Sequence, residues 1–202
     1  MSHSDLFVPL IIHAKYNNKW GHAVDCGIHH GSYSALFAEL FDIVTSIDAI
    51  VHPQAMENLS RFDNVNIVTQ CLFSTTGDYM TFYEVGSDAA LNTLDVDFLK
   101  HNDHDPSSIV EHTLTTARLD DIFDTPIDYL KTDLEGSDAD VISGAVDLID
   151  RYRPTVITDP DPKIARLLST LNYQRYVAAD TFGVGSEFSS NDAIYLPIER
   201  LI

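Results

Sequence analysis

Three ionisable residues alternate in the stretch YLKTDLEGSDADVISGA, residues 129–145: Lys131, Asp133 and Glu135. Alternate residues of an extended strand share one face, so these side chains lie together if the strand continues to Glu135. A covered ammonium needs a carboxylate partner, and Asp133 is the nearest one to Lys131 in sequence. The two carboxylates can position a hydroxyl group, accept its proton or hold a divalent cation. The alternative is structural: Lys131 and Asp133 form an ion pair, while Glu135 and Gly136 only shape the start of a helix.

A second candidate site is the turn VDCGIHHGS, which carries the pattern Asp25-x-Gly27-x-x-x-Gly31. Glycine permits a tight turn and the close approach of a ligand where a Cβ atom would clash. The dinucleotide fingerprint G-x-G-x-x-G is not met, because Asp25 stands where its first glycine belongs, and a P-loop lysine is also missing. Asp48 ends the next apolar run, where a carboxylate suits hydrogen bonds from ribose hydroxyls. This combination resembles the turn of Rossmann-like methyltransferases that use S-adenosylmethionine.

Strand-like and helix-like patterns alternate along the chain and must position these residues. Strands are expected at HAVDCG, IVTSIDAIV, NVNIVTQCLF, IDYLKTD, PTVITD, YQRYVAAD and DAIYLP. Helices are expected at SYSALFAELF, capped by Ser32, at QAMENLSRF, opened by Pro53, and at DADVISGAVDLIDRY and PKIARLLSTLN. The alternation predicts an α/β fold with a mainly parallel sheet and helices on both faces. It stops at about 74–116, where YMTFYEV and EHTLTTARL predict a β-hairpin insert within one domain, 1–202.

Four aspartates fall at or just past the ends of expected strands: Asp25, Asp48, Asp133 and Asp159. Ligands in open α/β sheets bind outside the carboxyl ends of the strands. Four acidic strand ends at one edge therefore predict a polar rim around a crevice. Each aspartate alone also has an ordinary explanation, because Asp favours turns and helix caps.

Charge and composition narrow the class of partner. The chain has 31 acidic and 12 basic residues in 202, a formal net charge of −19. Binding to nucleic acids or to anionic membrane surfaces requires clustered Lys and Arg, so neither partner is expected. The N-terminus lacks the features of a secretory signal, and no apolar run reaches the ~18 residues of a membrane helix. We expect a soluble, cytoplasmic protein whose acidity serves solubility.

Five stretches in order resemble the FkbM family of methyltransferases, from about residue 22 to residue 197. They are VDCGIHHGSYS for the first-strand turn D-x-G-x-x-x-G-x-x-S, NVNIVTQCLFSTTGD, TTARLDDIF, the motif K-x-D-x-E-G in IDYLKTDLEGSDADVISGA, and RYRPTVITD. The family usually has Glu-Pro where Asp48 is followed by Ala49, and Glu where this chain has Asp159. His29 stands where a small polar residue is more common, and the adjacent His29 and His30 lack the spacing of a zinc site.

The resemblance implies a Rossmann-like, doubly wound fold with a mainly parallel seven-stranded sheet and one antiparallel strand near the C-terminus. It implies S-adenosylmethionine as cofactor and O-methylation of a hydroxyl on a small-molecule or glycosyl acceptor. The implied site residues are Asp133, Glu135 and Lys131 for catalysis, Asp25, Gly27, Gly31, Ser34 and Asp48 for the cofactor, and Asp133, Glu135 and Asp159 for a divalent cation such as Mg²⁺. The alternative function is a catalytically silent nucleoside-binding or assembly module. A short chain without an evident cap domain also suits a protomer that completes its site in a homo-oligomer.

Overall fold

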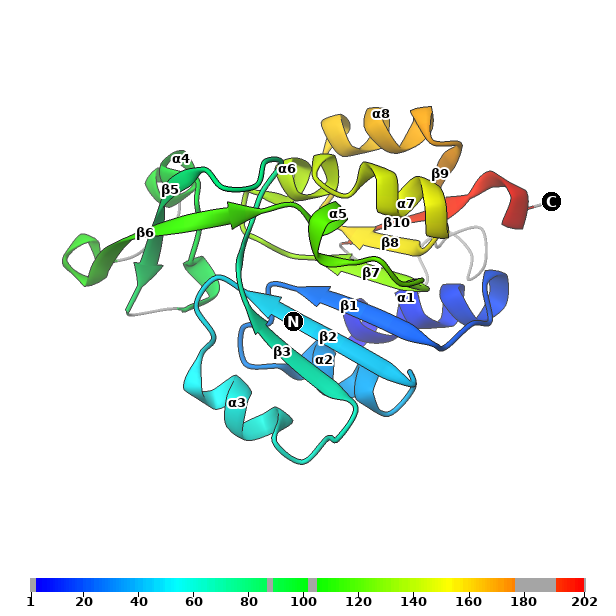
Figure 1. Ribbon diagram of the computed structural model, residues 1–202, viewed down its shortest axis with the longest axis horizontal. Helices are drawn as coiled ribbons and strands as arrows, with labels where there is room; N and C mark the ends of the chain where they lie inside the picture. The colour runs from blue at the N-terminus through cyan, green and yellow to red at the C-terminus, as the bar shows by residue number, and fades with distance from the viewer. Residues whose placement is uncertain (1–2, 87–88, 102–104, 177–191, 202) are drawn as a thin grey trace.

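The computed structural model describes residues 3–86, 89–101, 105–176 and 192–201. These residues form a seven-stranded sheet of order β3-β2-β1-β7-β8-β10-β9 and a three-stranded sheet of order β4-β6-β5 (Figure 1). The strands of the large sheet are β1 (His22–Cys26), β2 (Ile43–Asp48), β3 (Val65–Thr69), β7 (Tyr129–Thr132), β8 (Thr155–Thr158), β9 (Tyr173–Tyr176) and β10 (Ala193–Pro197). β10 is antiparallel to both β8 and β9, whereas the other pairs are parallel. The predicted mainly parallel sheet with one antiparallel strand near the C-terminus is confirmed.

Helices cover both faces of this sheet. They are α1 (His3–Tyr16), α2 (Ser32–Ala38), α3 (Pro53–Leu59), α5 (Leu119–Ile122), α6 (Asp138–Ser143), α7 (Val146–Tyr152) and α8 (Pro162–Thr170). One core cluster joins Val8 of α1 and Phe37 of α2 to Tyr129 of β7. The cluster on the other face joins Leu130 to residues of α5, α6, α7 and α8. Neighbouring residues of β7 therefore serve opposite cores, as strand geometry requires.

The predicted insert forms the small sheet. β5 (Tyr79–Val85) and β6 (Ile109–Ala117) pair as an antiparallel hairpin, while β4 (Cys71–Leu72) pairs in parallel with β6. The short helices of the insert are η1 (Ala89–Leu91), α4 (Val96–Lys100) and η2 (Pro106–Ser108), and η3 (Ile198–Arg200) follows β10. Figure 1 shows β5, β6 and α4 beyond the end toward which the arrows of β1 and β7 point. The insert thus stands over the carboxyl edge of the parallel strands.

Several predicted boundaries were wrong for identifiable reasons. The helix expected over 138–152 breaks into α6 and α7, because the Gly144 carbonyl accepts the Asp120 amide at 3.0 Å and the Leu148 amide donates to Asp120 Oδ1 at 2.8 Å. The third strand divides at Gln70, where the chain leaves the large sheet for the small one. Ser32 does not cap α2, whose N-cap is Gly31 with φ 83°. Pro53 opens α3 as predicted. Residues 177–180 of the stretch YQRYVAAD lie outside the described residues.

Candidate active site

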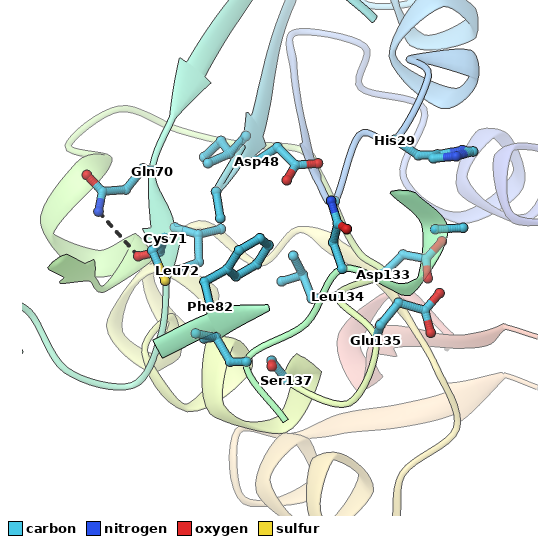
Figure 2. A pocket seen from close by; sticks show the side chains of 16 residues that line it. His29, Asp48, Gln70, Cys71, Leu72, Phe82, Asp133, Leu134, Glu135 and Ser137 are labelled. Carbon is cyan, nitrogen blue, oxygen red and sulfur yellow. Dashed lines mark hydrogen bonds between the residues drawn. The ribbon is translucent and has the colours of Figure 1, made fainter. Parts of the chain in front are cut away.

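A cavity opens at the carboxyl edge of the sheet, between the ends of β1, β2 and β7 and the insert (Figure 2). It is lined by Gly27, His29, Ile47, Asp48, Ala49, Gln70, Cys71, Leu72, Phe82, Ala90, Asn92, Leu94, Asp133, Leu134, Glu135 and Ser137. Four of the site residues expected from the sequence are among them: Gly27, Asp48, Asp133 and Glu135. Five are not: Asp25, Gly31, Ser34, Lys131 and Asp159. The expected convergence of strand ends thus occurs, with only part of the expected residues facing the cavity.

Asp48 closes β2 and holds the turn that follows β1. Its Oδ2 accepts a hydrogen bond from the Ile28 amide at 3.0 Å, and its Oδ1 accepts one from the Ile50 amide at 3.4 Å. Burial raises the pKa of Asp48, while the backbone donors act in the opposite direction. A carboxylate that accepts backbone N–H groups at the end of a parallel strand is oriented by the loops that form the cavity wall.

Gly27 is required by the packing of the backbone. Its φ is 83°, and a Cβ atom at this position would lie 1.9 Å from the carbonyl oxygen of Asp133. The Gly27 turn therefore lies directly against the chain after β7, which brings the Asp48 side of the cavity to the Asp133 side. Gly31, with φ 83°, faces the Leu59 side chain instead of the cavity, at 3.0 Å from the position of a Cβ.

Asp25 and Ser34 lie buried below the cavity. Both side chains are inaccessible, and Ser34 Oγ donates a hydrogen bond to Asp25 Oδ2 at 2.6 Å. Burial raises the Asp25 pKa, an effect that the nearby Lys131 opposes. Their position supports the turn from beneath and does not place them on the cavity surface.

Lys131 is the centre of this buried network. It is 2% exposed, and its Nζ lies 3.1 Å from Asp133 Oδ2, 3.7 Å from Asp25 Oδ1 and 4.2 Å from the centroid of the Tyr33 ring. Burial alone would lower the Lys131 pKa, but Asp25 and Asp133 raise it above its ordinary value. The Asp133 side chain is 39% exposed and reaches the cavity, so Lys131 contacts the cavity only through that carboxylate. The alternative of a structural ion pair therefore describes the geometry of Lys131.

Glu135 does not extend the strand, and the prediction of one shared face for Lys131, Asp133 and Glu135 was wrong. β7 ends at Thr132, and Glu135 has φ 44°, a conformation that costs a non-glycine residue energy. The buried Thr93 of the insert stabilises this backbone conformation of Glu135, because Thr93 Oγ1 donates to the Glu135 carbonyl oxygen at 2.6 Å. Thr93 Oγ1 also accepts the Asp95 amide at 2.9 Å. A tertiary contact from the insert thus directs the Glu135 carboxylate to the cavity.

Among the residues that line the cavity, Glu135 has the pKa best suited to proton transfer near pH 7. Its pKa is raised to about 7, first by burial and then by the negative charges of Asp133, Asp159 and Asp138, with Lys131 opposing. A carboxylate with a pKa near neutrality is suited to accept a proton from a substrate.

The expected divalent cation finds no support in the structure. No group of three or more His, Cys, Asp or Glu that could hold a metal ion occurs among the described residues. Asp159 follows β8 and lies outside the cavity that Asp133 and Glu135 line, so the three predicted ligands do not surround one point there. Asp133 Oδ2 also pairs with Lys131 at 3.1 Å, so that carboxylate already faces a cation of the protein itself.

The sequence reasoning missed the apolar wall of the cavity. Leu72, Phe82 and Leu134 come from β4, β5 and the segment after β7, and Figure 2 shows them grouped between Cys71 and Asp133. Apolar residues in strands predict a core equally well, so no local signal distinguishes those that border a cavity. The hairpin pattern was the available signal, since the insert supplies Phe82.

The chain is similar to known methyltransferases in its sequence and in its fold. The family model described as "Methyltransferase FkbM domain" matches residues 25–178. The solved structure of an FkbM methyltransferase from Methylobacillus flagellatus KT is similar with a TM-score of 0.50 and 16% identity; the match covers 89% of this chain but 44% of that one. An rRNA methylase from Streptococcus thermophilus has a TM-score of 0.50 at 13% identity, with 94% of this chain and 92% of that chain covered.

These structural similarities concern the fold alone. No curated protein matches the chain significantly. Among the described residues, none of the helices is both long and apolar enough to cross a membrane.

Proposed function

Because the chain belongs to the FkbM methyltransferase domain family, we propose that it is an S-adenosylmethionine-dependent methyltransferase acting on a hydroxyl of a small or glycosyl acceptor. One observation carries the proposal: Asp48 and Glu135 line the same cavity at the carboxyl edge of the sheet. In this proposal the first accepts hydrogen bonds from ribose hydroxyls, and the second, with a pKa of about 7, acts as a general base.

The residues of the cavity fit an adenosyl group in their chemistry. Asp48 supplies carboxylate oxygens at the end of β2, and Leu72, Phe82 and Leu134 supply an apolar wall for a flat ring. Such a combination of apolar lining with a few polar groups is usual for cofactor sites. When bound, the cofactor supplies a methyl group on a positively charged sulfur.

The chemistry left to this chain is alignment and proton removal. A hydroxyl is a weak nucleophile, and it becomes a stronger one if its proton leaves as its oxygen forms a bond to the methyl carbon. Glu135 accepts that proton on its carboxylate. Asp133, held by Lys131 at 3.1 Å, is placed to orient the hydroxyl. The raised pKa of Glu135 leaves the base partly protonated at pH 7, so the rate is expected to rise as pH increases through neutrality.

Calorimetry with S-adenosylhomocysteine, the demethylated product, tests the cofactor half of the proposal. Asp48→Ala should weaken binding by about 1–3 kcal/mol, because hydrogen-bonding groups of the ligand lose their partner. Glu57→Gln on the exposed face of α3 is the matched control and should leave affinity unchanged. Equal affinity in Asp48→Ala and the wild type would place the cofactor elsewhere.

Methyl-transfer assays over a panel of hydroxylated acceptors test the catalytic half. Glu135→Gln should retain the affinity for S-adenosylhomocysteine but lose turnover and its rise near pH 7. Undiminished turnover in this variant would exclude Glu135 as the base. Binding of the cofactor by the wild type without turnover on any acceptor would favour the silent nucleoside-binding module.

A further inference from the structure

A second cavity adjoins the first. It lies between the turn after β1, the segment from Ile50 to Pro53 and the end of β5, and it shares His29 and Asn92 with the first cavity. Its walls come partly from the loops that follow β1 and β2, with the start of α3, and partly from the insert. A molecule in this second cavity would therefore meet the first cavity along the His29–Asn92 boundary.

One wall is a row of imidazoles. The rings of His29 and His30 stack with centroids 3.8 Å apart and planes at 22°, and the ring of His52 lies 4.7 Å from that of His30. His52 Nδ1 accepts the Gln54 amide at 3.1 Å, so the neutral ring carries its proton on Nε2. This wall offers flat ring faces together with an N–H donor.

The opposite wall carries an acceptor. Glu84 of β5 lines the cavity, and its Oε2 lies 2.7 Å from His112 Nε2 on β6. This contact fixes the carboxylate on the insert side, and its oxygens can accept hydrogen bonds from hydroxyl groups. His52 and Glu84 thus line the same space from different elements.

Charge limits what this space can receive. None of the described residues that line either cavity is Lys or Arg, and the chain as a whole carries a net charge of −19. Phosphate groups are bound in proteins chiefly by Arg, Lys and backbone donors at helix starts. α3 starts at this cavity, but Pro53 has no N–H and the Gln54 amide already donates to His52 Nδ1. A phosphorylated ligand would also face Glu84 directly. An uncharged ligand meets no such repulsion.

We propose that the second cavity is the acceptor subsite and receives an uncharged polyhydroxylated ring such as a sugar. Ring C–H groups pack on the outer face of the His29–His30 stack, while hydroxyls bond to His52 and Glu84. The shared boundary directs one hydroxyl toward the cavity of Asp133 and Glu135. This assignment rests on the proposed methyltransferase function for its role, but the ligand class follows from the lining residues alone.

Saturation-transfer NMR measures the binding of neutral methyl glycosides of common hexoses, with glucose 6-phosphate as the charged counterprobe. The wild type should bind a glycoside and discriminate against the phosphate. Glu84→Gln and His52→Phe should each weaken glycoside binding about tenfold or more, as expected when a hydrogen bond of roughly 1.4 kcal/mol is lost. Glu57→Gln and His101→Phe, both outside the two cavities, are the matched controls and should bind as the wild type does.

Calorimetry with S-adenosylhomocysteine on the same variants separates this proposal from the proposed function. Its affinity should be unchanged in Glu84→Gln and His52→Phe, because neither residue lines the first cavity. Failure of every glycoside to bind, preference for the phosphate, or equal binding in all variants would overturn the subsite. Glycoside binding that depends on Glu84, in a protein that ignores S-adenosylhomocysteine, would confirm the ligand class and overturn the methyltransferase role.

Discussion

Removing the hydroxyl of Thr93 tests whether the insert positions Glu135. Thr93 is 1% exposed, and its Oγ1 makes two hydrogen bonds, to the Glu135 carbonyl oxygen at 2.6 Å and from the Asp95 amide at 2.9 Å. Thr93→Val keeps the shape of the side chain and leaves both backbone groups without this partner. Each such group costs about 1–3 kcal/mol when it is buried and unsatisfied. Because Glu135 and Asp95 are only partly buried, water recovers part of this, and we expect a total loss of about 2 kcal/mol in unfolding free energy.

The same substitution should alter the acidity of the site. Without the Thr93 contact, we expect the Glu135 backbone to relax from φ 44°, so that its carboxylate becomes less buried and moves away from Asp133 and Asp159. The Glu135 pKa of about 7 should then fall toward the ordinary value of roughly 4.3. Carbon-detected NMR titration of the Glu135 carboxyl follows this without any acceptor, and urea unfolding gives the stability.

Thr93→Ser is the matched control, because it restores the hydroxyl without the methyl group. It should recover most of the acidity shift, even if the lost methyl costs some stability. A Glu135 pKa that is the same in the wild type and in Thr93→Val would refute the positioning by Thr93. A shift that serine fails to correct would refute the role of the hydroxyl.

Three further predictions test the supporting structure. Lys131→Met should lower the unfolding free energy, measured with urea, by about 3–5 kcal/mol, since it leaves Asp25 buried and unpaired. Adding Asp25→Asn should recover a large part of this loss, and strict additivity of the two substitutions would contradict the pairing. His13 is buried and its pKa is lowered to about 4, mainly by desolvation. The unfolded chain therefore binds a proton that the folded His13 resists, and the unfolding free energy decreases as pH falls from about 6.5 toward 4, by up to about 3 kcal/mol at 1.36 kcal/mol per pKa unit. In His13→Gln the unfolding free energy should change less over this pH range than in the wild type. Gly27→Ala should destabilise the protein far more than Gly77→Ala, although both glycines have positive φ. A Cβ would lie 1.9 Å from a backbone oxygen at Gly27 and would have no neighbour within 4 Å at Gly77. Equal losses in thermal unfolding would contradict the close approach.

The sequence was sufficient for the sheet and for the edge at which the site lies. Apolar runs ending in Asp48 and near Asp133 were local signals, and parallel strands necessarily bring such ends to one edge. The hairpin pattern of the insert was local in the same way. α1 was not predicted, because Pro9 inside it interrupts the usual helical signal.

The orientation of individual side chains required contacts between distant segments. Glu135 adopts its conformation through Thr93, 42 residues away in the chain. The break between α6 and α7 depends on Asp120, which bonds to the Gly144 carbonyl and to the Leu148 amide. Whether Asp25 faced a ligand or the interior depended on Lys131 and Ser34, which bury it. None of these partners is marked by the pattern around the residue that it controls.

The path of the chain through the insert has a consequence for how such proteins diversify. β4 and β6 fasten the insert at its base, whereas Glu84 lies near the far end of β5 and Asn92 in the connection that follows it. A change in the length or composition of that outer segment leaves the register of the seven strands, and with it Asp48, untouched. On the proposed assignment, acceptor preference can be changed by design around Glu84, as long as Phe82 and Thr93, which serve the first cavity, are kept.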